Sequence, residues 1–197
     1  MDELLWHKVL EQRSSLPKET FALLSKYRAR ANYCRAFRNV HTVEIGEELG
    51  EAYFVMLKLG LACTAIEVLH TVIPGKIRIT SEQVDKALLR GEFEGLIESM
   101  VKNLDQKYDG GSGVRRRTYL KGSNQPHDLY KFMKDCRNLM FHGRFTPNEA
   151  RLDRAKRKRE LLLHLANVSL DQCDLALEKW IDGQRALRRR AEAKARR

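Results

Sequence analysis

The sequence contains few cysteines, and they lie far apart. Its 197 residues include four, with no Cys-x-x-Cys pair: Cys34, Cys63, Cys136 and Cys173. This spacing argues against a zinc site and against a disulfide framework. Each cysteine falls in an apolar helical context, where a free thiol behaves as a small core residue. We therefore expect all four thiols in the core, and no metal.

Long apolar runs and targeting signals are also lacking. Residues 1–6 carry neither a basic start nor a long apolar stretch of the kind found in signal peptides. The most apolar run, residues 52–72, is interrupted by Lys58, Glu67 and His70. The sequence therefore predicts a cytoplasmic protein with no membrane partner.

The common catalytic signatures are missing as well. The chain has no His/Glu zinc motif, no Gly-Lys-Ser/Thr phosphate loop, no Gly-x-Ser-x-Gly elbow, no defensible pair of catalytic carboxylates and no internal repeat. This argues against metallohydrolases, P-loop nucleotidases and α/β-hydrolases. We expect no cofactor.

Positive charge is what the chain has in excess. It carries 37 Lys and Arg against 26 Asp and Glu, for a net charge of +11 and a pI near 9.7. Such a balance favours a polyanionic partner, with nucleic acid first and an anionic membrane surface second. The simpler interpretation is a basic protein whose charge is concentrated in its tail.

The spacing of apolar residues predicts helices along the chain. Residues 47–71 are apolar on nearly every side, which is typical of a buried central helix. Further helices are predicted over residues 2–12, 18 to the late thirties, 81–104, 126–143 and 147–181. Between and after them we expect an extended connector at 76–80, a flexible basic loop at 108–125 and a fraying basic tail at 183–197. We expect an all-α fold: an antiparallel bundle of about five to six helices in a domain spanning 1–182, with a long C-terminal helix.

The helix over 126–143 has two distinct surfaces. Its apolar stripe consists of Leu129, Phe132, Met133, Cys136 and Met140. Arg137, Asn138 and His142 fall outside this stripe, toward a polar and basic surface that also carries Lys134 and Phe141. A helix that turns one face to its own core and such groups elsewhere is predicted to present them to a ligand.

Arg137 and His142 are five residues apart, roughly 7.5 Å along the axis and about 140° around it. One helix therefore makes a poor pocket for both. A two-fold related copy would supply a second pair across a groove, and two-fold dimers are the commonest closed assembly. The spacing favours a composite site in a homodimer.

The segment 137–143, Arg-Asn-Leu-Met-Phe-His-Gly, resembles the Arg-x4-6-His signature of the HEPN family (higher eukaryotes and prokaryotes nucleotide-binding domain) in its Arg-Asn-x-x-x-His form. The resemblance implies an all-helical bundle that dimerises. It also implies a metal-independent ribonuclease of toxin–antitoxin or antiphage-defence type. The motif itself covers seven residues, and the helical pattern is compatible over 1–182.

These residues suit internal transesterification of RNA. His142 can act as base or acid near neutral pH, and Arg137 suits the charge that develops on the phosphorane. Asn138 can orient His142 or the phosphate. We expect products with 2′,3′-cyclic phosphate and 5′-OH ends, as the resemblance also implies.

Further contacts to RNA are predicted near the motif. Arg144 and Lys134 are second-rank candidates on the motif helix and its flank. In the loop, Arg115, Arg116, Arg117 and Tyr119 have the chemistry to hold a phosphate backbone and stack a base, although a solvated insertion explains them equally well.

Three alternatives stay open. The chain could be a non-catalytic module that binds RNA or a nucleotide, or a regulatory partner that restrains a toxin, as an antitoxin does. Arg137 could also serve a neighbouring carboxylate in a purely structural role. Arg35 and His41 fit the loosest form of the signature, but they lie among several arginines that produce such spacing by chance.

Overall fold

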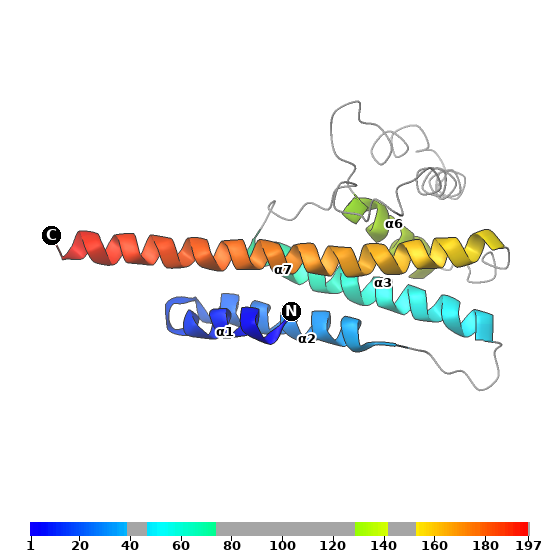
Figure 1. The fold of residues 1–197 in the computed structure, drawn as a ribbon, viewed down its shortest axis with the longest axis horizontal. Helices are drawn as coiled ribbons and strands as arrows, with labels where there is room; N and C mark the ends of the chain where they lie inside the picture. Colours follow the sequence, from blue (N-terminus) through cyan, green and yellow to red (C-terminus); the bar gives the residue numbers. More distant parts are fainter. Residues whose placement is uncertain (39–46, 74–128, 142–152, 197) are drawn as a thin grey trace, which may run out of the picture.

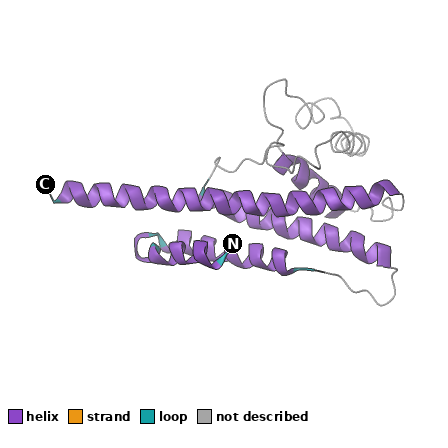
Figure 2. Cartoon of the chain, viewed as in Figure 1, coloured by secondary structure: helices purple, strands orange, loops and turns teal. Residues whose placement is uncertain are grey.

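The structure is a computed structural model that describes residues 1–38, 47–73, 129–141 and 153–196. This part of the chain forms five α-helices and a short 3-10 helix, without a strand (Figure 2). The all-α prediction is confirmed. The predicted helix at 81–104, the connector at 76–80 and the loop at 108–125 lie outside the described residues.

The first three predicted helices appear where the apolar pattern put them. α1 spans Glu3–Glu11 and begins at an Asp2 cap, whose side chain accepts a hydrogen bond from the backbone amide of Leu5 at 2.7 Å. A 3-10 helix, Arg13–Ser15, and Pro17 separate it from α2, Lys18–Ala36. α3 spans Glu47–Val72.

Two helices follow in the C-terminal half. α6 spans Leu129–Phe141, and α7 spans Asp153–Ala195. α7 continues beyond the predicted end of this helix near Ile181, and the basic tail is helical as far as Ala195. The sequence after Ile181 lacks an apolar face, but it is rich in Ala and Arg, which are strong helix formers. An i,i+4 ion pair between Arg188 and Glu192 at 2.9 Å adds support there.

α3 lies at the centre of the bundle (Figure 1). It packs against α2, α6 and α7, while α1 packs against α7. α2 and α6 run antiparallel to α3, whereas α7 runs in the same direction, with Arg159 near its start paired to Glu51 near the start of α3 at 3.0 Å (Figure 1). The long central helix is therefore confirmed as the element around which the others are arranged.

The core follows from the all-round apolar character of α3. Leu59, Cys63, Ile66 and Leu69 are fully buried, and Ala62 on the same helix allows its neighbours to approach closely. All four cysteines are buried, as predicted. Burial raises the pKa of the Cys63 thiol to about 12, so this thiol stays protonated and unreactive at neutral pH.

The apolar length of α3 raises the question of a membrane span. Within the described residues, Gly50–Val72 is long and apolar enough to cross a bilayer by length and composition. More than half of its most apolar window is buried against other helices, as in the core helix of a bundle. Lys58 is accommodated inside the fold, since its Nζ lies 3.5 Å from the Phe37 carbonyl and 5.5 Å from the ring centroid of Phe54.

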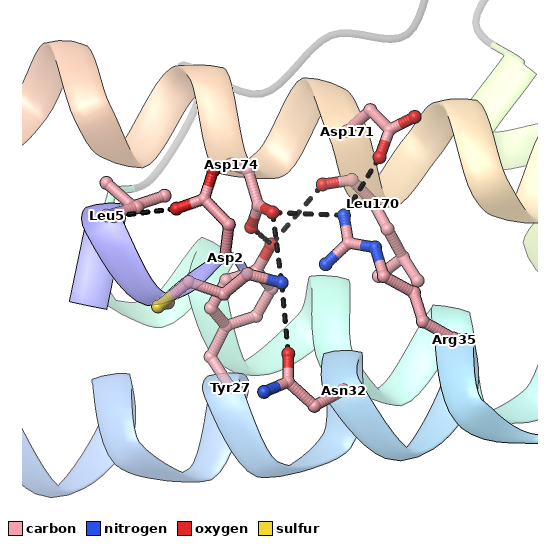
Figure 3. A network of polar contacts seen from close by, with 9 residues as sticks. Asp2, Leu5, Tyr27, Asn32, Arg35, Leu170, Asp171 and Asp174 are labelled. Carbon is pink, nitrogen blue, oxygen red and sulfur yellow. Dashed lines mark hydrogen bonds and ion pairs between the residues drawn. The ribbon is translucent and has the colours of Figure 1, made fainter.

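A polar network ties α1 and α2 to α7 (Figure 3). The Tyr27 hydroxyl donates to Asp174 at 2.6 Å, and the α-amino group of Met1 lies 3.0 Å from the same carboxylate. Arg35 pairs with Asp171 at 2.9 Å and with Asp174 at 3.0 Å. Arg35 is thus engaged by two carboxylates in this network, and His41 lies outside the described residues.

The central position of α3 can be tested by the effect of a mutation on stability. Leu59→Ala removes a fully buried side chain and should lower the free energy of unfolding by about 2–5 kcal/mol. The matched control is Leu57→Ala on the same helix, where the side chain is 36% exposed and the expected loss is about 1 kcal/mol or less. Urea unfolding of both variants measures the difference, and equal losses would contradict the described core.

Candidate functional site

α6 is oriented by its apolar stripe. Phe132, Met133 and Cys136 are buried against the bundle, as predicted. The Ser169 hydroxyl of α7 lies 3.8 Å from the Met133 sulfur, which marks the face of α7 against which α6 packs. With this stripe inside, Arg137 lies beside it and contacts Glu67 of α3, and Asn138 follows on the side away from the stripe.

The Arg137 guanidinium is held by two neighbours. Its Nε and Nη2 donate to Oδ1 of Asn138 at 3.1 and 2.9 Å. Its Nη1 donates to a carboxylate oxygen of Glu67 on α3 at 3.3 Å. The side chain is only 16% exposed, so its position is set by these contacts and by packing rather than by solvent.

Glu67 is shared between two cations of α6. The same carboxylate oxygen lies 3.4 Å from Nζ of Lys134 and 3.3 Å from Nη1 of Arg137. One turn further along α3, the His70 ring stacks on Tyr130 with centroids 5.2 Å apart. Glu67 and Arg137 are 70 residues apart, and no local pattern in the sequence indicates that they pair.

A groove runs beside Arg137, between α3 and α6. It has a volume of about 380 Å³, within the range of pockets that hold small ligands. Its lining consists of Leu57, Gly60, Leu61, Thr64, Arg137, Asn138 and Phe141. The groove therefore combines apolar walls with one guanidinium and one amide.

Phe141 forms one end of this lining and is 57% exposed. A Cβ at position 60 would lie 3.0 Å from two atoms of its ring, so the absence of a side chain at Gly60 lets the ring approach α3 closely. The α3 wall of the groove was missed from the sequence. α3 is apolar all round, so its pattern does not reveal which side is left uncovered by neighbours.

The charges around Arg137 favour an anion. Two cations, Arg137 and Lys134, share the single carboxylate of Glu67. A guanidinium has five N–H donors, of which the contacts to Asn138 and Glu67 use three. Two donors remain, and the described residues supply no acceptor for them. A phosphate is the kind of ligand that such a fork binds.

The structure brings together Arg137, Asn138 and Lys134 of the predicted site residues. His142, Arg144, Arg115, Arg116, Arg117 and Tyr119 lie outside the described residues, so their predicted roles stay predictions. Within the described ranges, no group of three His, Cys, Asp or Glu side chains is placed to hold a metal ion.

Comparison of the chain with family models, with curated proteins and with solved structures finds no match. The relation to the HEPN family therefore stays a resemblance of the segment 137–143. The ion pair between Arg137 and Glu67 is also what a purely structural role predicts for this arginine. The groove beside Arg137 is the feature that a structural role does not require.

The close contact between Gly60 and Phe141 can be tested by a double-mutant cycle. Gly60→Ala should stabilise α3 by about 1 kcal/mol in a Phe141→Ala background, where the ring is gone. In the presence of Phe141 the gain should be smaller or reversed, because the new methyl group meets the ring. Denaturant unfolding of the four proteins gives the coupling, and an equal effect in both backgrounds would show that the ring does not lie on Gly60.

Proposed function

We propose that the protein is a metal-independent endoribonuclease of toxin or antiphage-defence type, with Arg137, Asn138 and His142 in its active site. One observation carries the proposal: the Arg137 guanidinium is fixed at the edge of a groove, with two donors for which the described residues supply no acceptor. His142 follows Phe141 directly in the sequence, and Phe141 lines that groove. The net charge of +11 favours RNA as the polyanion.

The proposed reaction is attack of a ribose 2′-OH on the adjacent phosphorus. The 2′-oxygen–phosphorus bond forms, the bond to the 5′-oxygen breaks, and the products carry a 2′,3′-cyclic phosphate and a 5′-OH. One imidazole takes the 2′-OH proton and another protonates the leaving 5′-oxygen. Arg137 stabilises the extra charge on the phosphorane, and its fixed orientation means that little reorganisation is needed as this charge develops.

The two imidazoles imply two copies of the chain. The rim of the groove supports this part of the proposal, because Leu57 on α3 and Phe141 on α6 leave large apolar side chains exposed, at 36% and 57%. Exposed apolar patches next to polar groups mark interaction surfaces. A two-fold copy placed on this rim would bring a second Arg137 and a second His142 to the same cleft.

The second candidate is a non-catalytic module that binds RNA or a nucleotide. The ion pair of Arg137 with Glu67 favours it, since a paired arginine can serve binding or stability without turnover. This module would bind RNA in a salt-dependent manner and leave it intact.

The central test is cleavage of labelled RNA by the purified protein with and without EDTA. We expect cleavage in both, with cyclic phosphate and 5′-OH ends. Arg137→Ala should lower kcat/KM by about 10²–10³-fold, because one donor to the phosphorane is lost. His142→Ala should lower it by about 10²–10⁴-fold.

The matched control is Arg13→Ala, which removes an arginine that stacks on Phe21 at 5.1 Å, away from α6. It should leave the rate unchanged. Loss of cleavage in EDTA, together with full activity of both site variants, would exclude the proposed mechanism. Tight binding of RNA without turnover would favour the second candidate.

The composite site makes a further prediction. Arg137→Ala and His142→Ala protein, each nearly inactive alone, should regain measurable activity when they are unfolded together and refolded as a mixture. A mixed dimer retains one Arg137 and one His142 in the shared cleft, so the guanidinium and one of the two proton transfers act together again, whereas each parent dimer lacks one of these groups entirely. Analytical ultracentrifugation gives the oligomeric state in parallel, and a dimeric mixture without recovery would contradict a site shared between protomers.

A further inference from the structure

The last part of α7 extends past the ends of α1 and α2 as an exposed helix (Figure 1). We call residues 183–196 the arm. Every residue from 186 to 196 is exposed. The arm has six cations and one carboxylate, a net charge of +5 within the +11 of the chain. Its exposed residues, 186–196, account for +4 of this charge, so more than a third of the excess charge lies on this exposed helix.

Some of these cations are neutralised and others are not. Arg185 pairs with Glu11 of α1, and Arg188 pairs with Glu192. In the described part of the chain, no ion pair involves Arg190 or Lys194, which are exposed neighbours at i,i+4. Like charges at this spacing repel each other, and a bound anion relieves the repulsion.

The side of the arm that carries these two cations is set by the helical period. Ser169 faces α6, because its hydroxyl contacts the Met133 sulfur. At about 100° per residue, Arg190 and Lys194 fall within about 60° of the direction of Ser169. Arg189 and Arg196 fall about 160–180° away, on the opposite side. Arg190 and Lys194 thus continue the same side of α7 on which α6 and Arg137 lie.

The distance along this side follows from the helical rise. From the level of Ser169 to Arg190 and Lys194, α7 rises roughly 32–38 Å at 1.5 Å per residue. Arg137 is one turn beyond Met133 in the opposite direction, because α6 runs antiparallel to α7. The separation is therefore roughly 40 Å, which corresponds to about 14 base pairs of an A-form RNA helix at about 2.8 Å each.

We propose that Arg190 and Lys194 bind the phosphate backbone of an RNA stem about 14 base pairs away from the phosphate held at Arg137. This inference rests on the proposed function for its choice of RNA, and it names the substrate class as a stem of about 14 or more base pairs. Two anchors on one straight side of a rigid helix match a rigid duplex, whereas a flexible strand would lose more entropy in spanning them. A membrane surface fits less well, because Leu187 is the only large apolar residue of the arm.

The test is equilibrium binding of full-length protein to 2′-O-methyl RNA hairpins in EDTA, with stems of about 6 to 24 base pairs. For the wild type, affinity should rise until the stem reaches about 14 base pairs and then level off. Arg190→Gln/Lys194→Gln should abolish this rise and lower the slope of log K against log salt by about 2 for long stems only. The matched control, Arg189→Gln/Arg196→Gln, removes the same charge from the opposite side of the arm and should keep the rise.

Several results would overturn the inference. These are an equal loss of affinity in both double variants, no loss of affinity in either, or an equal loss of affinity for short and long stems. Binding to anionic vesicles in preference to RNA would also overturn it. A failure of this inference can be distinguished from a failure of the proposed catalysis. If binding depends on stem length and on Arg190 and Lys194, but unmodified RNA is not cleaved, catalysis is excluded and the role of the arm is still supported.

Discussion

The constraint on which the structure depends is the burial of α3. A helix that is apolar on nearly every side must be covered on every side, and α2, α6 and α7 provide that cover. The cover is incomplete along the line of Leu57 and Leu61, where α3 stays partly exposed. This uncovered line is one wall of the groove, and α6 provides the other. The groove is therefore a consequence of how far the neighbouring helices reach around α3.

Two arginines of the chain show how the balance of charge separates a structural from a candidate functional role. Arg35 is surrounded by Asp171 and Asp174, so carboxylates at least match the cations there (Figure 3). Among the described residues around Arg137 the balance is reversed, since Arg137 and Lys134 share the carboxylate of Glu67. The described carboxylates thus balance the charge of Arg35, whereas those at Arg137 leave an excess of positive charge beside the groove. This difference favours an anion at Arg137 over one at Arg35.

The sequence was sufficient to predict the helices but not the contacts between them. The stripe of Phe132, Met133 and Cys136 predicted both the existence of α6 and its buried face, because apolar periodicity reports burial directly. The length of α7 was missed, since that periodicity stops near Ile181 while helix propensity continues through the Ala and Arg residues beyond it. The pairing of Glu67 with Arg137 and the fit of Phe141 over Gly60 depend on how two helices pack, and no local pattern encodes this.

The anchoring of Arg137 bears on both roles that can be assigned to it. Pinning a guanidinium at three of its donors removes conformational freedom before a ligand arrives, so less entropy is lost when a phosphate binds. Glu67 lowers the net charge at this position, but it also keeps the two remaining donors oriented instead of letting the side chain extend into solvent. A structural role needs only the ion pair, whereas a phosphate needs the oriented donors and space beside them. The groove at Arg137 supplies that space, which is why our proposal assigns the active site to α6 and not to another arginine-rich helix that the structure describes.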